Sequence, residues 1–249
     1  FVNIWIYTKA DVCLFENVRG LLYANGVEAL KEITNQFSEI GYDLEVRLLN
    51  AADYGVPQFR ERVFILGSKI GKLKFPFPTH GPDSLDNKPF TSVLDSIKDI
   101  YDKNEKKQIM NGKYGYLLSD VPEGHNYSFF TEKMGYPNPV FGWRTKFSNF
   151  LYKLDRNQPS RTIQAQPGKY SGPFHWNNRK LTTEELQRIQ SFPKDFTFIG
   201  GTSVALHQIG NSVAPLLSYK IATSIKKQIL NEEINSNELI ESGFKFSFD

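Results

Sequence analysis

Apolar residues in the first part of the chain form three short runs and one long helical pattern. The runs at 12–15, 44–49 and 63–66 have the length and composition of strands. Between the first two runs, apolar residues recur at spacings of three and four, which predicts an amphipathic helix over 27–40, with Gly41 after its end. These residues are Val27, Leu30, Ile33, Phe37 and Ile40. A strand, a helix and a strand in this order predict a βαβ unit within a largely parallel, buried sheet.

The middle of the chain, residues 79–178, has no long period and is rich in proline, glycine, asparagine and aromatic residues. Residues 72–178 contain 15 lysines and arginines against 10 acidic residues, and 14 aromatic residues lie between Tyr114 and Trp176. A basic, aromatic and loop-rich segment suits a nucleic-acid contact surface. An irregular small domain with an aromatic core is the alternative that the composition leaves open.

The last third of the chain has helical patterns. Thr182 and Glu185 form a capping box ahead of a helix that we expect to end at Pro193. Apolar residues four apart predict a second helix near 213–230. The tail 231–249 is polar and then rich in phenylalanine, so it fits either a loose end or a docking strand. Its phenylalanines are Phe244, Phe246 and Phe248.

Composition narrows the classes of protein that fit. The chain has 249 residues, a net charge of +3 and one cysteine, which excludes a disulfide framework and a multi-cysteine metal site. No apolar run is long enough to cross a membrane and no secretory signal is present, so we expect a cytoplasmic protein. The chain begins with Phe1, so we expect either that a segment was removed or that it belongs to a longer polypeptide.

Three polar stretches carry candidate chemistry. Glu16 follows the first predicted strand, where open α/β sheets place ligand-binding groups, although an ordinary helix-capping acid is equally compatible. The segment 49–67 contains Gln-x-Arg-x-Arg at the start of the third strand. Because side chains alternate along a strand, these three would point to the same side. The alternative is that they are surface charges on a strand edge. The run 208–215 places Gly-Asn-Ser at the start of a helix, which suits a small polar ligand or simply caps the helix.

Taken together and in this order, these stretches resemble the cytosine-5 DNA methyltransferase family. Residues 15–21 resemble that family's Glu-Asn-Val motif, and 49–67 the segment that ends in Gln-x-Arg-x-Arg. Four further segments are similar to segments of the same family: 91–97, 161–168, 179–193 and 208–215.

The resemblance implies roles for residues at the matching positions. Glu16 would hold the N3 and amino edge of a flipped cytosine, which makes ring carbon C6 more electrophilic. Asn17 would orient the loop, and Arg62 would contact the O2 edge with support from Arg60 and Gln58.

The resemblance also implies a cofactor and a substrate. Residues Asn211, Ser212 and Val213 would border the pocket for S-adenosyl-L-methionine. The segment of about 80–178 would read double-stranded DNA, with the target base extruded from the duplex. The candidate DNA contacts are Arg144, Lys146, Arg156, Arg161 and Lys169.

Two features of the family are missing from this sequence. It has no early Phe-x-Gly-x-Gly loop and no Pro-Cys dipeptide to supply the thiolate that adds to C6. Cys13 lies inside the first strand and is interpreted as structural, so this chain supplies no nucleophile. We expect an N-terminal half, either a second subunit or part of a longer chain, to carry the Pro-Cys motif. A catalytically inactive DNA-binding remnant or specificity subunit is the alternative.

The sequence therefore predicts an α/β fold: part of a Rossmann-like S-adenosylmethionine-dependent methyltransferase domain and a smaller, irregular target-recognition domain. The expected ranges are 1–78 for the last strands of the catalytic domain, 79–205 for target recognition, 206–230 for a returning helix and 231–249 for the tail. The expected activity is DNA (cytosine-5-)-methylation in a bacterial restriction–modification system. The histidines show no metal-ligand spacing, and the long recognition region argues against an RNA methyltransferase of the same family.

Overall fold

The computed structural model describes residues 7–23, 25–85, 87–100, 110–234 and 238–240. The chain divides into two compact units. Unit 1 consists of residues 1–54, 60–89 and 216–249, and unit 2 of residues 55–59 and 90–215. In the described part of the chain, no helix combines the length and apolar character that a membrane crossing requires.

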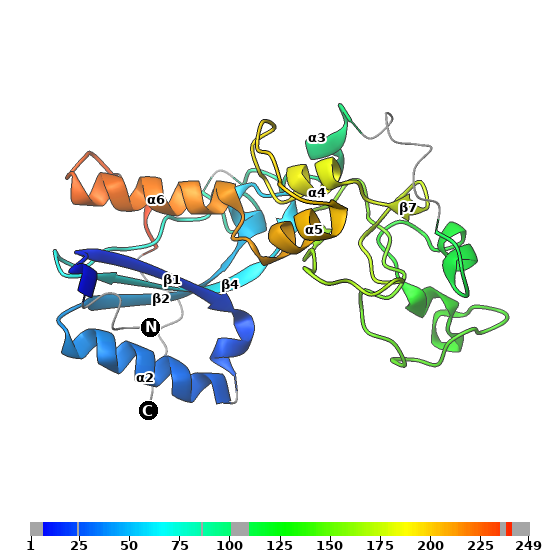
Figure 1. The fold of residues 1–249 in the computed structure, drawn as a ribbon, viewed down its shortest axis with the longest axis horizontal. Helices are drawn as coiled ribbons and strands as arrows, with labels where there is room; N and C mark the ends of the chain where they lie inside the picture. The colour runs from blue at the N-terminus through cyan, green and yellow to red at the C-terminus, as the bar shows by residue number, and fades with distance from the viewer. Residues whose placement is uncertain (1–6, 24, 86, 101–109, 235–237, 241–249) are drawn as a thin grey trace. The chain divides into compact units, whose positions relative to one another are not determined.

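Unit 1 contains a three-stranded sheet in the order β1-β4-β2, formed by Val12–Val18, Glu61–Ser68 and Asp43–Asn50 (Figure 1). The central strand β4 is antiparallel to both neighbours, so the expected largely parallel pairing is wrong. The reason lies in the connection from β2 to β4. It spans only residues 51–60 and contains a single 3₁₀ turn, Ala51–Tyr54, so the chain reverses and pairs antiparallel instead of crossing over.

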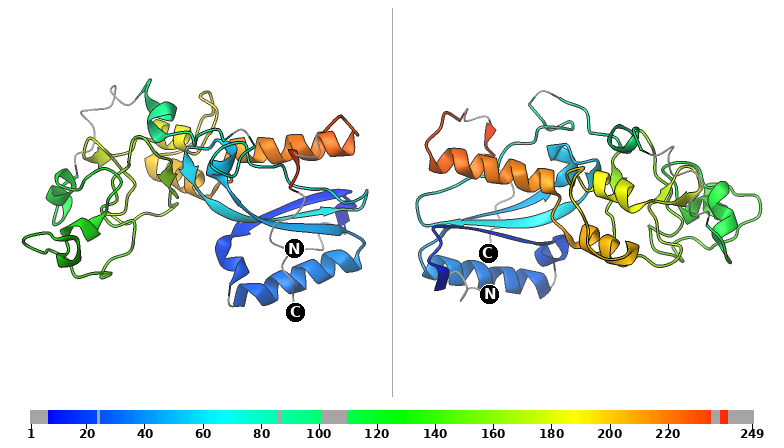
Figure 2. Two further views of the ribbon diagram at one scale, coloured as in Figure 1. Left: turned by 180° about the vertical axis from the view of Figure 1, so that it is seen from behind. Right: turned by 45° about the horizontal axis from the view of Figure 1, so that its top comes forward.

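Helices cover both faces of this sheet (Figure 2). Helix α2, Asn25–Glu39, follows the predicted apolar pattern and packs Leu30 and Ile33 against Val63 and Ile65 of β4. The helix ends in a Schellman turn at Gly41, which has a φ of +86°, with Tyr42 N–H donating to Phe37 O at 3.1 Å. Helix α6, Pro215–Ile229, lies on the opposite face of the sheet.

Two further segments of unit 1 refine the predictions from sequence. Strand β1 continues through Val18, so Glu16 lies within the strand and not after it. Part of the tail pairs with residues 75–77 through an isolated antiparallel β-bridge: Phe77 N–H donates to Glu238 O at 2.7 Å, and Ile240 N–H donates to Phe75 O at 3.0 Å. The tail phenylalanines at 244, 246 and 248 lie outside the described residues.

Unit 2 has little regular structure. Its strands are pairs of residues: β3, Gln58–Phe59, pairs in parallel with β5, Ser160–Arg161, and β6, Phe174–His175, pairs antiparallel with β7, Arg179–Lys180. Its helices are α3, Val93–Ile97, α4, Thr183–Ile189, and α5, Thr202–Asn211. The remaining short turns are 3₁₀ helices at Gly115–Ser119, Tyr127–Phe130 and Glu132–Met134, and in unit 1 at Arg19–Leu22.

Eight aromatic residues of unit 2 pack into one core. Phe130, Phe141 and Phe150 are buried. Phe141 packs edge to face with Tyr127, Phe130 and Phe150, and Tyr127 also packs edge to face with Phe150. A second core joins α3, α4 and α5 through aliphatic residues such as Ile97, Leu186 and Ile209, with Trp176 at its edge. The aromatic composition therefore reflects packing as well as surface.

The boundaries differ from the expected ranges for identifiable reasons. Residues 79–89 belong to unit 1, where the N–H groups of Thr79 and His80 donate to Asp53 O. The helix expected near 213–230 is confirmed as α6, whereas the start of the expected 206–230 range belongs to α5 in unit 2. Helix α4 ends at Ile189 in a Schellman turn at Ser191, which has a φ of +67°, before Pro193 is reached.

Candidate active site and DNA-recognition surface

Two of the predicted catalytic residues meet on the sheet of unit 1. Glu16 of β1 faces Phe64 across the ladder, and Arg62 of β4 faces Val18, so the two side chains are diagonal neighbours on one face. Arg62 Nε lies 3.0 Å from Glu16 Oε1. Glu16 is 27 % exposed and Arg62 15 % exposed, so solvent reaches both groups. Because Val63 and Ile65 face α2, alternation places this pair on the face toward α6.

Arg60 adds a second positive charge to the same neighbourhood. It is 2 % exposed, and burial, together with the charge of Arg62, lowers the pKa of Arg60 to about 10. Burial also lowers the pKa of Arg62, and the charge and hydrogen bond of Glu16 oppose that shift. Asn17 lies next to Glu16 and accepts a hydrogen bond from Val18 N–H at 2.8 Å through Oδ1, which fixes the end of β1. The structure thus brings Glu16, Arg60 and Arg62 together.

Gln58 does not extend this group, so the expected alignment of Gln58, Arg60 and Arg62 along one strand is wrong. The extended segment breaks at Arg60, whose N–H donates to Asn50 Oδ1 at 3.0 Å instead of joining a ladder. Gln58 is fully buried in unit 2, where its Oε1 accepts a hydrogen bond from Ile163 N–H at 2.9 Å.

A chain of amide hydrogen bonds connects Gln58 with the Gly-Asn-Ser segment. Gln58 Nε2 donates to Gln190 Oε1, and Gln190 Nε2 donates to both the carbonyl oxygen and the hydroxyl oxygen of Ser212, each at 3.0 Å. Gln190 is fully buried at the C-terminus of α4. Reasoning from sequence did not single out Gln190. The Gln-Ser-Phe-Pro segment that contains it was the available signal, but only the tertiary fold pairs it with Gln58.

The Gly-Asn-Ser segment ends helix α5 and does not begin a helix, contrary to expectation. Ser212 is the C-cap residue of α5, and its hydroxyl donates to Ile209 O at 2.8 Å. The Asn211 side chain is exposed and lies 2.9 Å from His207 Nε2. Val213 is half-buried in the connection to α6.

A second arginine–glutamate pair organises the core of unit 2. Arg179 donates to both carboxylate oxygens of Glu185, at 2.8 and 2.7 Å, and Thr182 N–H donates to the same carboxylate at 2.8 Å as part of the predicted capping box. Arg179 is 1 % exposed and Glu185 is fully buried. Nearby His175 is neutral, because burial and the charges of Arg179 and Arg156 lower its pKa to about 3.

Two of the predicted DNA contacts, Lys146 and Lys169, lie beside one aromatic group of unit 2. Lys146 Nζ lies 5.8 Å from the ring centroid of Phe150, and Arg161 donates to Ser148 O at 3.0 Å. Lys169 Nζ lies 5.5 Å from the ring of Tyr170, which in turn contacts Phe150. Arg144 is exposed two residues before Lys146. Arg156 is instead engaged with Glu123 through several hydrogen bonds and lies over Trp176.

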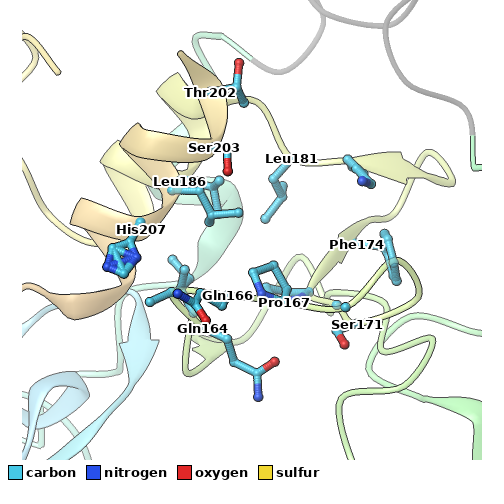
Figure 3. Close-up of a pocket in the computed structure, with 17 residues that line it drawn as sticks. Gln164, Gln166, Pro167, Ser171, Phe174, Leu181, Leu186, Thr202, Ser203 and His207 are labelled. Carbon is cyan, nitrogen blue, oxygen red and sulfur yellow. The ribbon is translucent and has the colours of Figure 1, made fainter. Parts of the chain in front are cut away.

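A cavity of about 620 Å³ lies within unit 2 (Figure 3). One wall is the loop that carries Gln164, Gln166 and Pro167, and helix α5 with Ser203 and His207 lies opposite. Its apolar surface comes from Ile163, Phe174, Leu181, Leu186 and Leu206.

The only cysteine of the chain is structural. Cys13 is 2 % exposed and packs in β1 opposite Gly67, where a Cβ would lie 2.5 Å from its sulfur. Burial raises the pKa of the Cys13 thiol, which disfavours the thiolate that nucleophilic attack requires.

Comparison with known proteins shows which proteins this chain is similar to. The chain is 34 % identical over 247 residues to the type II methyltransferase M.SacI of Streptomyces achromogenes, covering 92 % of this chain and 63 % of the relative. It is 35 % identical over 234 residues to the type II methyltransferase M.NgoFVII of Neisseria gonorrhoeae, covering 90 % of this chain and 60 % of that protein. The chain thus spans less than two thirds of the length of these relatives.

The fold also has a match among solved structures. A prophage-encoded E. coli protein described as a DNA modification methyltransferase superposes with a TM-score of 0.58 at 24 % identity, covering 90 % of this chain and 71 % of that one. The sequence model of the C-5 cytosine-specific DNA methylase family matches residues 1–227. The protein therefore belongs to the C-5 cytosine-specific DNA methylase family, whose members use S-adenosyl-L-methionine as methyl donor.

Proposed function

We propose that this chain forms the cytosine-binding and DNA-recognition part of a DNA (cytosine-5-)-methyltransferase of a bacterial restriction–modification system, acting on DNA in the cytoplasm. The observation that carries the proposal is the Glu16–Arg62 pair. A 3.0 Å contact between two partly exposed groups on neighbouring strands leaves polar atoms available to a ligand. The type II methyltransferases that the chain resembles support the same activity.

The chemistry of the pair suits a cytosine ring outside the duplex. The Glu16 carboxyl group would bind the N3 and amino edge of the base, and Arg62 would hold the carboxyl group in place and contact O2. Stabilising charge that develops at N3 lowers the barrier to nucleophilic addition at C6. Arg60 adds positive charge to the site, and Asn17 fixes the backbone beside Glu16.

The described residues fit only the border of a cofactor site. The Ser212 hydroxyl is engaged with Gln190 and Ile209, whereas the Asn211 side chain is exposed and Val213 is half-buried. Asn211 and Val213 would therefore contact S-adenosyl-L-methionine from one side, with Ser212 holding the segment in shape. The cofactor supplies the methyl group.

The nucleophile is proposed to come from polypeptide beyond these 249 residues. Cys13 is buried in the sheet, and the sequence has no Pro-Cys dipeptide. An N-terminal half, as a second subunit or as part of the same chain, would supply both this thiolate and the glycine loop for the cofactor. The chain alone would then bind DNA without methylating it.

Reconstitution tests this proposal. The chain is mixed with an N-terminal methyltransferase half that carries Pro-Cys, and transfer of radiolabelled methyl groups to duplex DNA is measured. We expect transfer only from the mixture, together with covalent trapping of duplexes in which 5-fluorocytosine replaces cytosine. Methyl transfer by the chain alone would contradict the proposal that the nucleophile comes from another polypeptide segment. Absence of transfer and trapping in the mixture, with DNA still bound, would favour an inactive specificity subunit.

A further inference from the structure

The cavity of unit 2 is bordered by two glutamines whose amide groups have no hydrogen-bonding partner among the described residues. Gln164 and Gln166 are exposed and lie on the loop formed by residues 163–168. Within the described part of the chain, neither side-chain amide has a hydrogen-bonding partner. Each amide therefore offers the donors of its NH₂ group and the acceptor of its carbonyl oxygen to a ligand.

The backbone of this loop is held in place at two points. At its start, Ile163 N–H donates to the buried Gln58, which is itself held by Gln190. In its middle, the loop lies directly on Gly210 of α5. A Cβ at Gly210 would lie 2.4 Å from both the N and Cα atoms of Ala165, a distance that only glycine allows without displacement of the loop.

The charge around the cavity favours an anionic partner. Among the described residues that line it, none is acidic, and Lys180 is exposed at its edge. The neighbouring Lys169 adds a second exposed cation. A fixed loop with free amides beside exposed lysines has the donors and acceptors that base reading needs, while the lysines can contact phosphates.

We infer that Gln164 and Gln166 are specificity-determining residues, each of which reads one A·T base pair of the DNA, and that Gln58 and Gly210 are positioning residues for their loop. This inference rests on the proposed function. A glutamine amide matches adenine in the major groove, because it accepts from the N6 amino group while it donates to N7. The fixed backbone limits where each amide can reach, so each glutamine addresses a single position.

Base selectivity can be measured with and without methyl transfer. Duplexes bound by the full-length methyltransferase are selected from a random library and sequenced, and initial methylation rates are then compared on the selected site and on copies with each A·T pair replaced by G·C. We expect the selected site to contain A·T pairs. At one of them, Gln164→Ala or Gln166→Ala should lower the preference for A·T over G·C about 10- to 100-fold. Gln158→Ala, which removes another exposed glutamine of unit 2, is the matched control and should keep wild-type selectivity.

The positioning role has a paired test on one helix. Gly210→Ala should reduce discrimination at the same base pairs as the glutamine variants, although alanine is the better helix former. Gly201→Ala is the matched control, because a Cβ there has no heavy atom within 4 Å, and it should leave selectivity unchanged. Thermal unfolding of both variants separates a moved loop from a destabilised unit.

The outcomes separate the inference from the proposed function. A selected site made only of G·C pairs, or unchanged selectivity in both glutamine variants, would overturn the inference while methylation continued. Selective DNA binding without any methylation would overturn the proposed activity and leave the inference standing on the binding data. Absence of DNA binding would overturn both.

Discussion

The molecule contains two arginine–glutamate pairs that differ mainly in their access to solvent. In unit 1, Arg62 meets Glu16 through a single 3.0 Å contact, with 15 % and 27 % of the two side chains exposed. In unit 2, Arg179 and Glu185 are 1 % and 0 % exposed and bond through two contacts. The Glu185 carboxylate also accepts a hydrogen bond from Thr182 N–H. In the described part of the chain, by contrast, Arg62 is the one hydrogen-bonding partner of the Glu16 side chain.

We propose that this difference in exposure separates a functional pair, Glu16–Arg62, from a structural one, Arg179–Glu185. The Glu185 carboxylate has its acceptor positions used within the protein and is shielded from any ligand. Glu16 retains acceptor capacity at a surface that a base can approach. The same two residue types therefore hold a fold together in one unit and are available for recognition in the other, and the accessible pair is the one that the family resemblance assigns to catalysis.

The largest expected effect comes from breaking the buried pair. Arg179→Met leaves the Glu185 charge buried without its partner, so we expect the free energy of unfolding to fall by about 3–5 kcal/mol. Urea unfolding followed by tryptophan fluorescence, with Trp176 beside the pair, measures the change in the full-length protein. Arg19→Met, which breaks the exposed Arg19–Glu61 pair, is the control and should leave the midpoint unchanged. If the two substitutions lowered the free energy of unfolding equally, burial would not explain the contribution of the Arg179–Glu185 pair to stability.

Acid should weaken the buried region through His175. Its folded pKa of about 3 lies below the unfolded value near 6.5, so the unfolded state binds the proton first and stability falls as pH drops below 6.5. By pH 5 the loss amounts to about 2 kcal/mol.

The comparison with His175→Asn isolates this contribution. Asp53 has a folded pKa raised to about 6 by burial and by the charges of Asp83 and Glu61, so it acts in the opposite direction over part of this range. Asp53 is present in both the wild type and His175→Asn, so its contribution cancels in the difference between their stabilities. The stability advantage of the wild type over His175→Asn should therefore shrink between pH 7.5 and pH 5. A constant advantage would show that His175 is already protonated or is not buried.

The smallest effect is expected at the capping box. Thr182 accepts a hydrogen bond from Glu185 N–H at 3.2 Å, and Thr182→Ala removes that bond while the Arg179–Glu185 pair remains. We expect a loss of about 1 kcal/mol in the free energy of unfolding. Thr182→Ser, which keeps the hydroxyl, should recover most of it. A loss as large as that of Arg179→Met would mean that the cap, and not the ion pair, fixes Glu185.

Local patterns predicted the elements but not their pairing. The apolar period located α2, and Thr182 and Glu185 located the start of α4, because both signals act within one or two turns. The antiparallel insertion of β4 depends on how the chain returns after β2, which no periodicity encodes.

The candidate site shows the same limit. The two motifs that contain Glu16 and Arg62 were each visible in the sequence, and the structure brings these residues to one face of the sheet. The break at Arg60 was not predictable, since it depends on a hydrogen bond to Asn50 on the preceding strand. The buried bond between Gln58 and Gln190 was not predictable either, since it joins residues 132 positions apart. Contacts of this kind follow from the tertiary fold alone.

The central claim is that the accessible pair acts on the base and not on the fold. It is tested most directly by measuring single-turnover methyl transfer and urea unfolding on the same preparation of Glu16→Gln in the full-length enzyme. We expect a methyl-transfer rate at least about 100-fold below wild type, because an interaction with the transition state is lost, and an unchanged unfolding midpoint. A rate close to wild type, or a rate loss matched by a loss of stability, would contradict the central claim.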